Sequence, residues 1–234
     1  MGKNKLSRFR ELEQLERVFQ PPFEEVFQKD YYLKGKWKTQ VFKNKNPIVL
    51  ELGCGKGEYT VGLAGMYPDK NYIGIDIKGA RLWKGAKMAH QTSLSNVAFL
   101  RTRIEFIQSF FGKEEIDEIW ITFPDPQIKK RRNKKRLTGS RFLNAYRTML
   151  KDQGTVHLKT DNDTLYAYTL DLMNYNNLEI KYKTNDLYRS ELMDSALSIR
   201  TFYESQYLEE GKSINYLSFR LPSGKIIKEL PENG

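Results

Sequence analysis

A glycine-rich segment and an acidic residue beyond it are the first features of the chain that could bind a ligand. The segment reads Glu-Leu-Gly-Cys-Gly-Lys-Gly over residues 51–57, and it follows an apolar run at 48–52. Glycines such as Gly53 and Gly55 let the backbone turn sharply and approach a ligand with no Cβ in the way. Asp76 ends the next apolar run, 21 residues after Gly55. At this spacing an acidic side chain reaches a pair of ribose hydroxyls, although an ordinary helix N-cap is the alternative.

Three features of the loop favour S-adenosylmethionine as its ligand. The glycines are spaced G-x-G-x-G, whereas dinucleotide-binding loops have G-x-G-x-x-G. The loop lacks the Gly-Lys-Ser/Thr ending of a phosphate-binding P-loop. Glu51 precedes it, and a carboxylate there would repel a pyrophosphate but suit the cationic sulfonium and amino group of S-adenosylmethionine. A nicotinamide oxidoreductase is therefore the least favoured reading.

A second group of candidate residues follows another apolar run, at 116–122. The sequence continues Phe-Pro-Asp-Pro-Gln, so that Asp125 stands between two prolines that restrict its backbone. A run with seven cations in eight positions comes next, at 129–136, in a chain of formal net charge +10. The simplest interpretation of such a cluster of charges is a solvent-exposed loop that binds nothing. Seven cations repel one another strongly enough that a nucleic acid is the better interpretation.

The elements that must position these residues alternate between strands and helices. Such alternation is typical of βαβ units, which predicts an α/β fold with a doubly wound, mostly parallel, seven-stranded Rossmann-like sheet. The last two strands complete one edge, as an antiparallel hairpin if they pair directly. The segment 140–150 is predicted as a helix with Ser140 as its N-cap. The expected strands are 48–52, 71–76, 97–100, 116–122, 154–159, 178–184 and 213–221, and the other expected helices lie near 58–67, 79–92 and 163–174.

Residues 1–46 are expected to form a basic helical N-terminal extension, and residues 47–234 the single catalytic domain.

No stretch approaches the roughly 18 apolar residues that span a bilayer, so we expect no membrane partner. The single cysteine, Cys54, fits a reducing cytoplasm. No metal is expected to be required, and the sequence leaves monomer and homodimer open.

Five motifs together resemble one family, the bacterial tRNA (guanine-N7-)-methyltransferases. They are ELGCGKG, YIGIDIK, FPDPQIKKRRNKKRL, HLKTDN and TFYE, in the order typical of that family and within residues 47–220. The Pro-Asp-Pro motif that runs into a basic cluster is the most specific of them, and the glycine loop is the least. The resemblance implies methyl transfer from S-adenosylmethionine to N7 of a guanine in tRNA, in the variable loop.

The resemblance also implies roles for individual residues. Glu51, Asp76 and Asp125 would contact the cofactor, and Asp125 would be the catalytic residue. Arg103 stands where an acidic residue is common, so main-chain groups of Arg103 and Ile104, or the Glu105 carboxylate, would read the adenine. The positions that look substrate-contacting are Lys129, Asp161, Thr201, Phe202, Tyr203 and Glu204. Those that look tRNA-contacting are Arg131, Arg132, Asn133, Lys134, Lys135 and Arg136.

The expected chemistry needs no nucleophilic side chain, because guanine N7 carries a lone pair of its own. The protein must align N7 with the methyl group, and carboxylates of Asp125 and Asp161 would hold the guanine edge and oppose its developing positive charge. Asp161 has a structural alternative as a helix cap. A methyltransferase for another RNA base atom, or a non-catalytic RNA-binding module on the same fold, are the alternatives for the whole chain.

Overall fold

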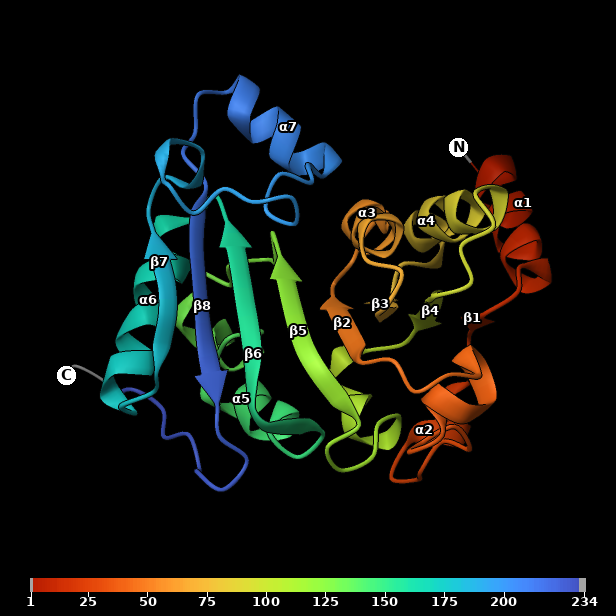
Figure 1. Ribbon diagram of the computed structural model, residues 1–234, viewed down its shortest axis with the longest axis horizontal. Helices are drawn as coiled ribbons and strands as arrows, with labels where there is room; N and C mark the ends of the chain where they lie inside the picture. The colour runs from red at the N-terminus through yellow and green to blue at the C-terminus, as the bar shows by residue number, and fades with distance from the viewer. Residues whose placement is uncertain (1, 232–234) are drawn as a thin grey trace.

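The computed structural model describes residues 2–231, apart from the side chains of residues 2–5, 130 and 131. Its strands form one eight-stranded sheet in the order β1-β4-β3-β2-β5-β6-β8-β7, with helices on both faces (Figure 1). The strands are β1 (Val18–Phe19), β2 (Ile48–Leu52), β3 (Asn71–Asp76), β4 (Val97–Arg101), β5 (Ile116–Thr122), β6 (Leu150–Thr160), β7 (Ile180–Thr184) and β8 (Asn215–Leu221). The α-helices are α1 (Gly2–Gln14), α2 (Phe23–Val26), α3 (Glu58–Met66), α4 (Gly79–Gln91), α5 (Ser140–Tyr146), α6 (Asp163–Tyr175) and α7 (Phe202–Glu209). A π-helix, η1 (Trp37–Phe42), and three 3₁₀ helices, η2 (Ile104–Ser109), η3 (Lys130–Lys135) and η4 (Leu187–Arg189), complete the elements.

The strand order confirms a doubly wound, mostly parallel sheet. From β2 the chain moves outward through β3 and β4 and then returns to place β5 on the other side of β2. Among the described strands, β8 alone is reversed, and it pairs antiparallel with both β6 and β7. The reversal between β2 and β5 is a topological switch point, and in such sheets ligands bind beyond the carboxyl ends of the strands there.

The prediction of seven strands was wrong, because the N-terminal segment supplies an eighth. β1 pairs in parallel with β4 and so forms the edge of the sheet. A strand of two residues is too short to give a sequence pattern. The rest of the segment also packs into the domain: Leu12 and Trp37 are fully buried, and the Trp37 indole donates to the Phe110 carbonyl at 2.8 Å. The N-terminal extension therefore shares its buried side chains with the rest of the chain.

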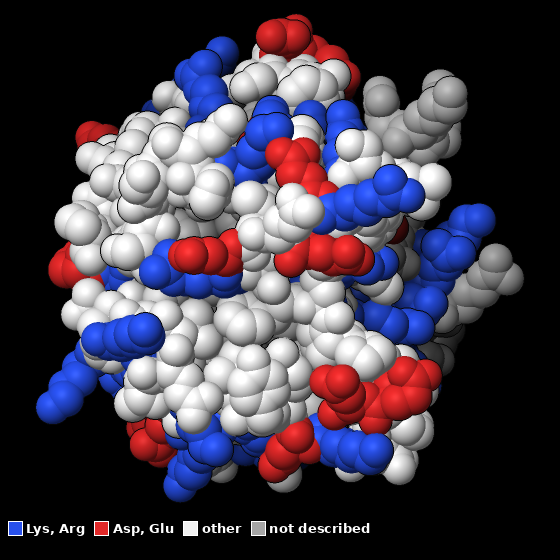
Figure 2. Space-filling model, turned by 90° about the vertical axis from the view of Figure 1, so that its right-hand side faces the viewer, with Lys and Arg blue, Asp and Glu red and all other residues white. Residues whose placement is uncertain are grey.

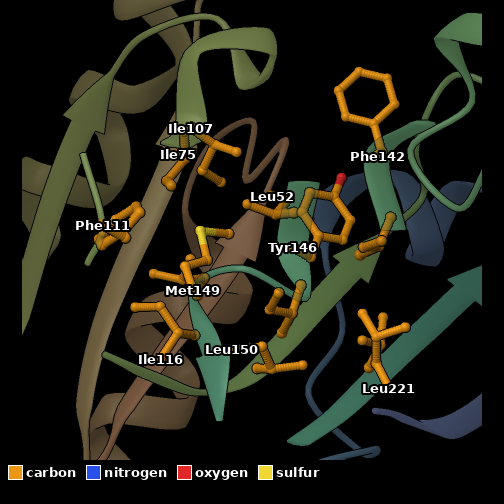
Figure 3. Packing of buried hydrophobic residues seen from close by; sticks show 14 of the residues in the cluster. Leu52, Ile75, Ile107, Phe111, Ile116, Phe142, Tyr146, Met149, Leu150 and Leu221 are labelled. Carbon is orange, nitrogen blue, oxygen red and sulfur yellow. The ribbon is translucent and has the colours of Figure 1, made fainter. Parts of the chain in front are cut away.

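Two hydrophobic cores flank the sheet, and β2 contributes to both. Ile48, Leu50 and Leu52 point to the core beneath α5 and α6, part of which Figure 3 shows. Val49 points to the opposite core, beneath α1, α3 and α4. Because successive strand residues alternate between faces, Glu51 also points toward α3.

The helix expected at 140–150 is shorter than its apolar pattern predicts. Gly139, not Ser140, is the N-cap of α5, and the Ser140 hydroxyl donates to Glu229 at 2.7 Å. Leu150 is buried as expected, but it opens β6 and pairs with Ile116. An apolar run alone could not show where the helix ends and the strand begins.

Within the described residues, no helix is long and apolar enough to cross a membrane.

Candidate active site

The glycine loop forms the turn that its spacing predicts at the switch point. Gly53 and Gly55 have φ angles of 75° and 55°, in the left-handed region that favours glycine. The amides of Gly53 and Cys54 both donate to the Ile75 carbonyl, at 2.8 and 3.0 Å. Gly57, which the sequence analysis did not single out, has a φ of 69°, and a Cβ there would lie 2.7 Å from the Phe99 ring. The loop is thus held by its own backbone and by close packing.

Asp76 joins the end of β3 to this loop. One carboxylate oxygen accepts from the Gly55 amide at 3.0 Å and the other from the Lys78 amide at 2.7 Å. Asp76 is not the N-cap of α4, because that position is Lys78. Its carboxylate keeps free lone pairs and lines a cavity at the edge of the sheet.

This cavity has a volume of about 300 Å³ and combines an apolar wall with polar groups. Ile104, Leu137 and Phe142 line it, and so does Gln127, whose buried Oε1 has no hydrogen-bond partner among the described residues. The other lining residues are Gly53, Asp76, Ile77, Thr102, Arg103, Glu105 and Lys135. An apolar wall beside a carboxylate and an unpaired amide oxygen suits an adenosyl group, so these residues fit S-adenosylmethionine.

Arg103 and Ile104 both line the cavity as expected, but the Arg103 side chain turns outward. It is 55 % exposed, and its guanidinium pairs with the Glu105 carboxylate at 3.2 Å. Burial alone would raise the pKa of Glu105, but hydrogen bonds and the Arg103 charge outweigh burial and lower it. The Glu105 carboxylate is therefore an ionised acceptor at the rim of the cavity.

Glu51 lies behind the glycine loop and does not line the cavity. It is 3 % exposed and accepts hydrogen bonds from the Thr60 amide at 2.8 Å and the Thr122 hydroxyl at 2.6 Å, and another from the Thr60 hydroxyl. Burial raises its pKa to about 7, although these hydrogen bonds favour the ionised form. Glu51 thus connects β2 with α3 and β5.

The loop after β5 carries Asp125, which does not line the cavity, although Gln127 two residues later does. The Phe123 amide donates to the Lys159 carbonyl at 2.8 Å, which continues the β5–β6 ladder to the start of the loop. Asp125 itself is exposed, and its Oδ1 accepts from the Gln127 amide at 3.0 Å. The loop backbone is therefore fixed while the carboxylate faces solvent.

The basic run, predicted to contact RNA throughout, is divided between two orientations. Arg132, Lys134 and Lys135 are exposed, as is Lys129 before them. Arg136 is only 6 % exposed: its Nε donates to the Pro126 carbonyl at 3.3 Å, and its guanidinium lies 4.2 Å from the centroid of the Tyr168 ring. Arg136 therefore stabilises the Asp125 loop through its hydrogen bond to the Pro126 carbonyl. Asn133 is half-buried, and the Arg131 side chain lies outside the described residues.

The segment Thr201–Glu204 is divided in the same way. Thr201 is the N-cap of α7 and forms a capping box with Glu204. Glu204 is fully buried and pairs at 2.8 Å with the equally buried ammonium of Lys159. Phe202 is 45 % exposed and Tyr203 half-buried, and both rings lie near the Lys56 ammonium of the glycine loop.

Lys159 is the main residue that the sequence analysis missed. Its ammonium also donates to the carbonyls of Leu197 and Ile199, at 3.0 and 3.3 Å. Burial lowers its pKa, although the Glu204 charge opposes this. A lysine inside an apolar strand pattern was the available signal, since a buried lysine needs a partner.

Asp161 lies at the end of β6, beside the strand that leads to Asp125. Its side chain is 21 % exposed, and its carboxylate is 3.5 Å from the Lys212 ammonium. The cap of the following helix is Asn162, whose side chain accepts from the Leu165 amide at 2.8 Å. Asp161 is thus free of the capping role.

Within the described part of the chain, no group of three or more His, Cys, Asp or Glu residues is placed to hold a metal ion.

The fold and cavity together define a Rossmann-like, S-adenosylmethionine-dependent methyltransferase. Among solved structures, a 16S rRNA methyltransferase, KamB, is similar over 78 % of this chain and 91 % of its own, with a TM-score of 0.59 at 12 % identity. An antibiotic-related methyltransferase also has a TM-score of 0.59, at 19 % identity over 82 % of this chain and 96 % of its own. At such identities the likeness concerns the fold alone.

Sequence comparison assigns the family. Residues 45–217 match the family described as "Putative methyltransferase". The tRNA (guanine-N(7)-)-methyltransferase of Christiangramia forsetii is 55 % identical over 94 % of this chain and 99 % of its own length. The protein of the same name from Bacteroides thetaiotaomicron is 49 % identical over 98 % of this chain and 90 % of its own. The chain belongs to the tRNA (guanine-N(7)-)-methyltransferase family.

Proposed function

We propose that the protein transfers the methyl group of S-adenosylmethionine to N7 of a guanine in the variable loop of tRNA, in the cytoplasm. The observation that carries this is the meeting of three features at one edge of the sheet: the 300 Å³ cavity, the Asp125 loop and the exposed cations of η3. The names of the relatives supply the substrate atom.

The residues of the cavity would hold the cofactor, which supplies an activated methyl group on a cationic sulfonium when bound. Asp76 would accept from the ribose hydroxyls, and main-chain groups at Arg103 and Ile104 would read the adenine. Glu51 would act from behind the glycine loop. A cation above the loop favours the ionised form of this buried carboxylate, which in turn attracts the cation.

The carboxylates at the mouth would hold the guanine. Asp125 and Asp161 would accept hydrogen bonds from its N1–H and amino group and oppose the positive charge that develops on the purine. Because N7 has its own lone pair, alignment is the main task, and fixed backbone on both sides of Asp125 serves it. Lys129, Phe202 and Tyr203 would contact the RNA around the target guanine from the rim.

The exposed part of the basic run would bind the tRNA backbone. Arg132, Lys134 and Lys135 are free to meet phosphates, whereas Arg136, Thr201 and Glu204 would act by holding the loops that carry the contacting residues.

The test is to identify the product. Unmodified tRNA is incubated with the protein and methyl-labelled S-adenosylmethionine, then digested to nucleosides and analysed by mass spectrometry. Label in 7-methylguanosine is expected, and it should disappear from a tRNA whose variable-loop guanines are replaced by adenine. Label in another nucleoside would indicate a different RNA methyltransferase, and no label at all would indicate a non-catalytic RNA-binding protein.

A further inference from the structure

Three cations gather on the side of the mouth that is formed by the glycine loop and the start of α7. The Lys56 ammonium lies 3.1 Å from the centroid of the Phe202 ring and 5.7 Å from that of Tyr203. The Arg81 guanidinium, in the first turn of α4, is also 5.7 Å from the Tyr203 ring. Lys84 follows one turn later on α4 and pairs with Glu58 at 2.9 Å. Cations from two elements thus surround two aromatic rings.

Glu58 is the one carboxylate that these contacts bring to the three cations. It also accepts from the Phe202 amide at 2.6 Å, which anchors the start of α7 beside the glycine loop. The pKa of Lys56 is lowered, chiefly by burial; the Glu58 charge opposes this effect, and the charges of Lys84 and Arg81 add to it. The cluster therefore keeps an excess of positive charge.

The next lysine of the same helix is neutralised. Lys87, farther along α4, pairs with Glu11 at 2.7 Å, and on the face that Figure 2 shows, lysine and arginine side chains lie among carboxylates. A group of three cations with one carboxylate, beside two aromatic rings, is a different kind of surface. It is the combination that binds single-stranded nucleic acid, through phosphates on the cations and bases stacked on the rings.

We propose that Lys56, Arg81 and Lys84, with the rings of Phe202 and Tyr203, form a second RNA-contacting surface across the mouth from η3. The cations bind phosphates, and a base next to the target guanine stacks on the Phe202 ring. The RNA strand then spans the mouth between the two basic groups, which presents the guanine to the Asp125 loop. The inference rests on the proposed function and adds residues that carry the substrate on the α7 side.

The first test is the salt dependence of tRNA binding by the double variant Arg81→Gln/Lys84→Gln. Affinity for unmodified tRNA is measured from 50 to 200 mM salt, together with affinity for S-adenosylmethionine. The slope of log affinity against log salt should become shallower by about 1.4, since each lost phosphate contact with a single strand removes about 0.7. Cofactor affinity should change less than about twofold. The matched control is Lys113→Gln/Lys181→Gln, which removes the same charge from exposed sites away from the mouth and should leave the slope unchanged.

The second test isolates stacking. Phe202→Leu keeps an apolar side chain but removes the ring, so the KM for tRNA should rise about tenfold with an unchanged salt slope. An unchanged slope in the double variant, or an unchanged KM in Phe202→Leu, would overturn the proposal. Either result with normal 7-methylguanosine formation would leave the proposed function intact, whereas a wild-type protein that forms no 7-methylguanosine would overturn that function itself.

Discussion

The side of the site proposed to hold the cofactor and the side proposed to hold RNA, called the cofactor side and the RNA side below, are built in different ways. On the cofactor side, main-chain amides of the glycine loop make the hydrogen bonds that fix its shape. The Gly53 amide donates to the Ile75 carbonyl, and the Gly55 amide donates to the Asp76 carboxylate. On the RNA side, side chains that look like ligands for RNA do the holding: Arg136 supports the Asp125 loop and Glu204 pairs with Lys159. Glycine spacing therefore reports the shape of the backbone directly. A motif of charged residues reports composition but not which side chains face outward.

The largest expected effect comes from breaking the buried pair on the RNA side. Lys159→Met leaves the Glu204 charge buried without its partner and should lower the free energy of unfolding by about 3–5 kcal/mol. The double variant Lys159→Met/Glu204→Leu removes both charges and should recover most of this loss. Denaturant unfolding of Lys159→Met, of Glu204→Leu and of the double variant measures the coupling free energy between the two side chains. Strictly additive losses would show that the pair does not hold α7 to β6.

Removing the exposed carboxylate at the mouth should affect turnover without affecting the fold. Asp125→Ala should lower kcat about 10²- to 10³-fold, because the carboxylate opposes charge that develops during transfer. The melting temperature and the affinity for S-adenosylmethionine should change little. Asp171→Ala, an exposed carboxylate on α6, is the matched control. A folded Asp125→Ala protein with full turnover would remove this residue from the mechanism.

The cofactor side has one buried side chain that should make stability depend on pH. The folded pKa of Glu51 is about 7, above its usual 4.5, so folding favours the protonated form. This contribution is complete below about pH 4.5 and is lost as pH rises to about 7. The free energy of unfolding, relative to the Glu51→Gln variant, should therefore fall by roughly 3 kcal/mol over that interval. A constant difference between the two proteins from pH 4 to pH 8 would contradict the shifted pKa.

The smallest expected effect is at the rim of the cavity. The Arg103 side chain points outward and pairs with Glu105, so Arg103→Ala should change the affinity for S-adenosylmethionine by less than about tenfold, or roughly 1.4 kcal/mol. Titration calorimetry on the wild type and the variant measures this. A larger loss, in a protein that still melts cooperatively, would mean that the arginine side chain itself holds the cofactor.

The sequence predicts the parts of this molecule that follow from local pattern. The strands at 48–52, 71–76 and 116–122 are where their apolar runs place them, and the turn at Gly53 follows from its glycines. β1 was missed because two residues carry no periodicity, and its pairing with β4 depends on the tertiary fold. The orientations of Arg136 and Glu204 were missed for the same reason. Each depends on a partner distant in sequence, Tyr168 in one case and Lys159 in the other.

The most direct test of the difference between the two sides compares cations within one basic run. Salt-dependent tRNA binding and thermal melting are measured for Arg132→Gln/Lys134→Gln and for Arg136→Gln. The exposed pair should make the log–log slope shallower by about 2 and leave the melting temperature unchanged. Arg136→Gln should lower the melting temperature and leave the slope nearly unchanged, because its guanidinium is buried against Tyr168 and Pro126. A shallower slope for Arg136→Gln at an unchanged melting temperature would contradict the account, since it would place this arginine on the RNA.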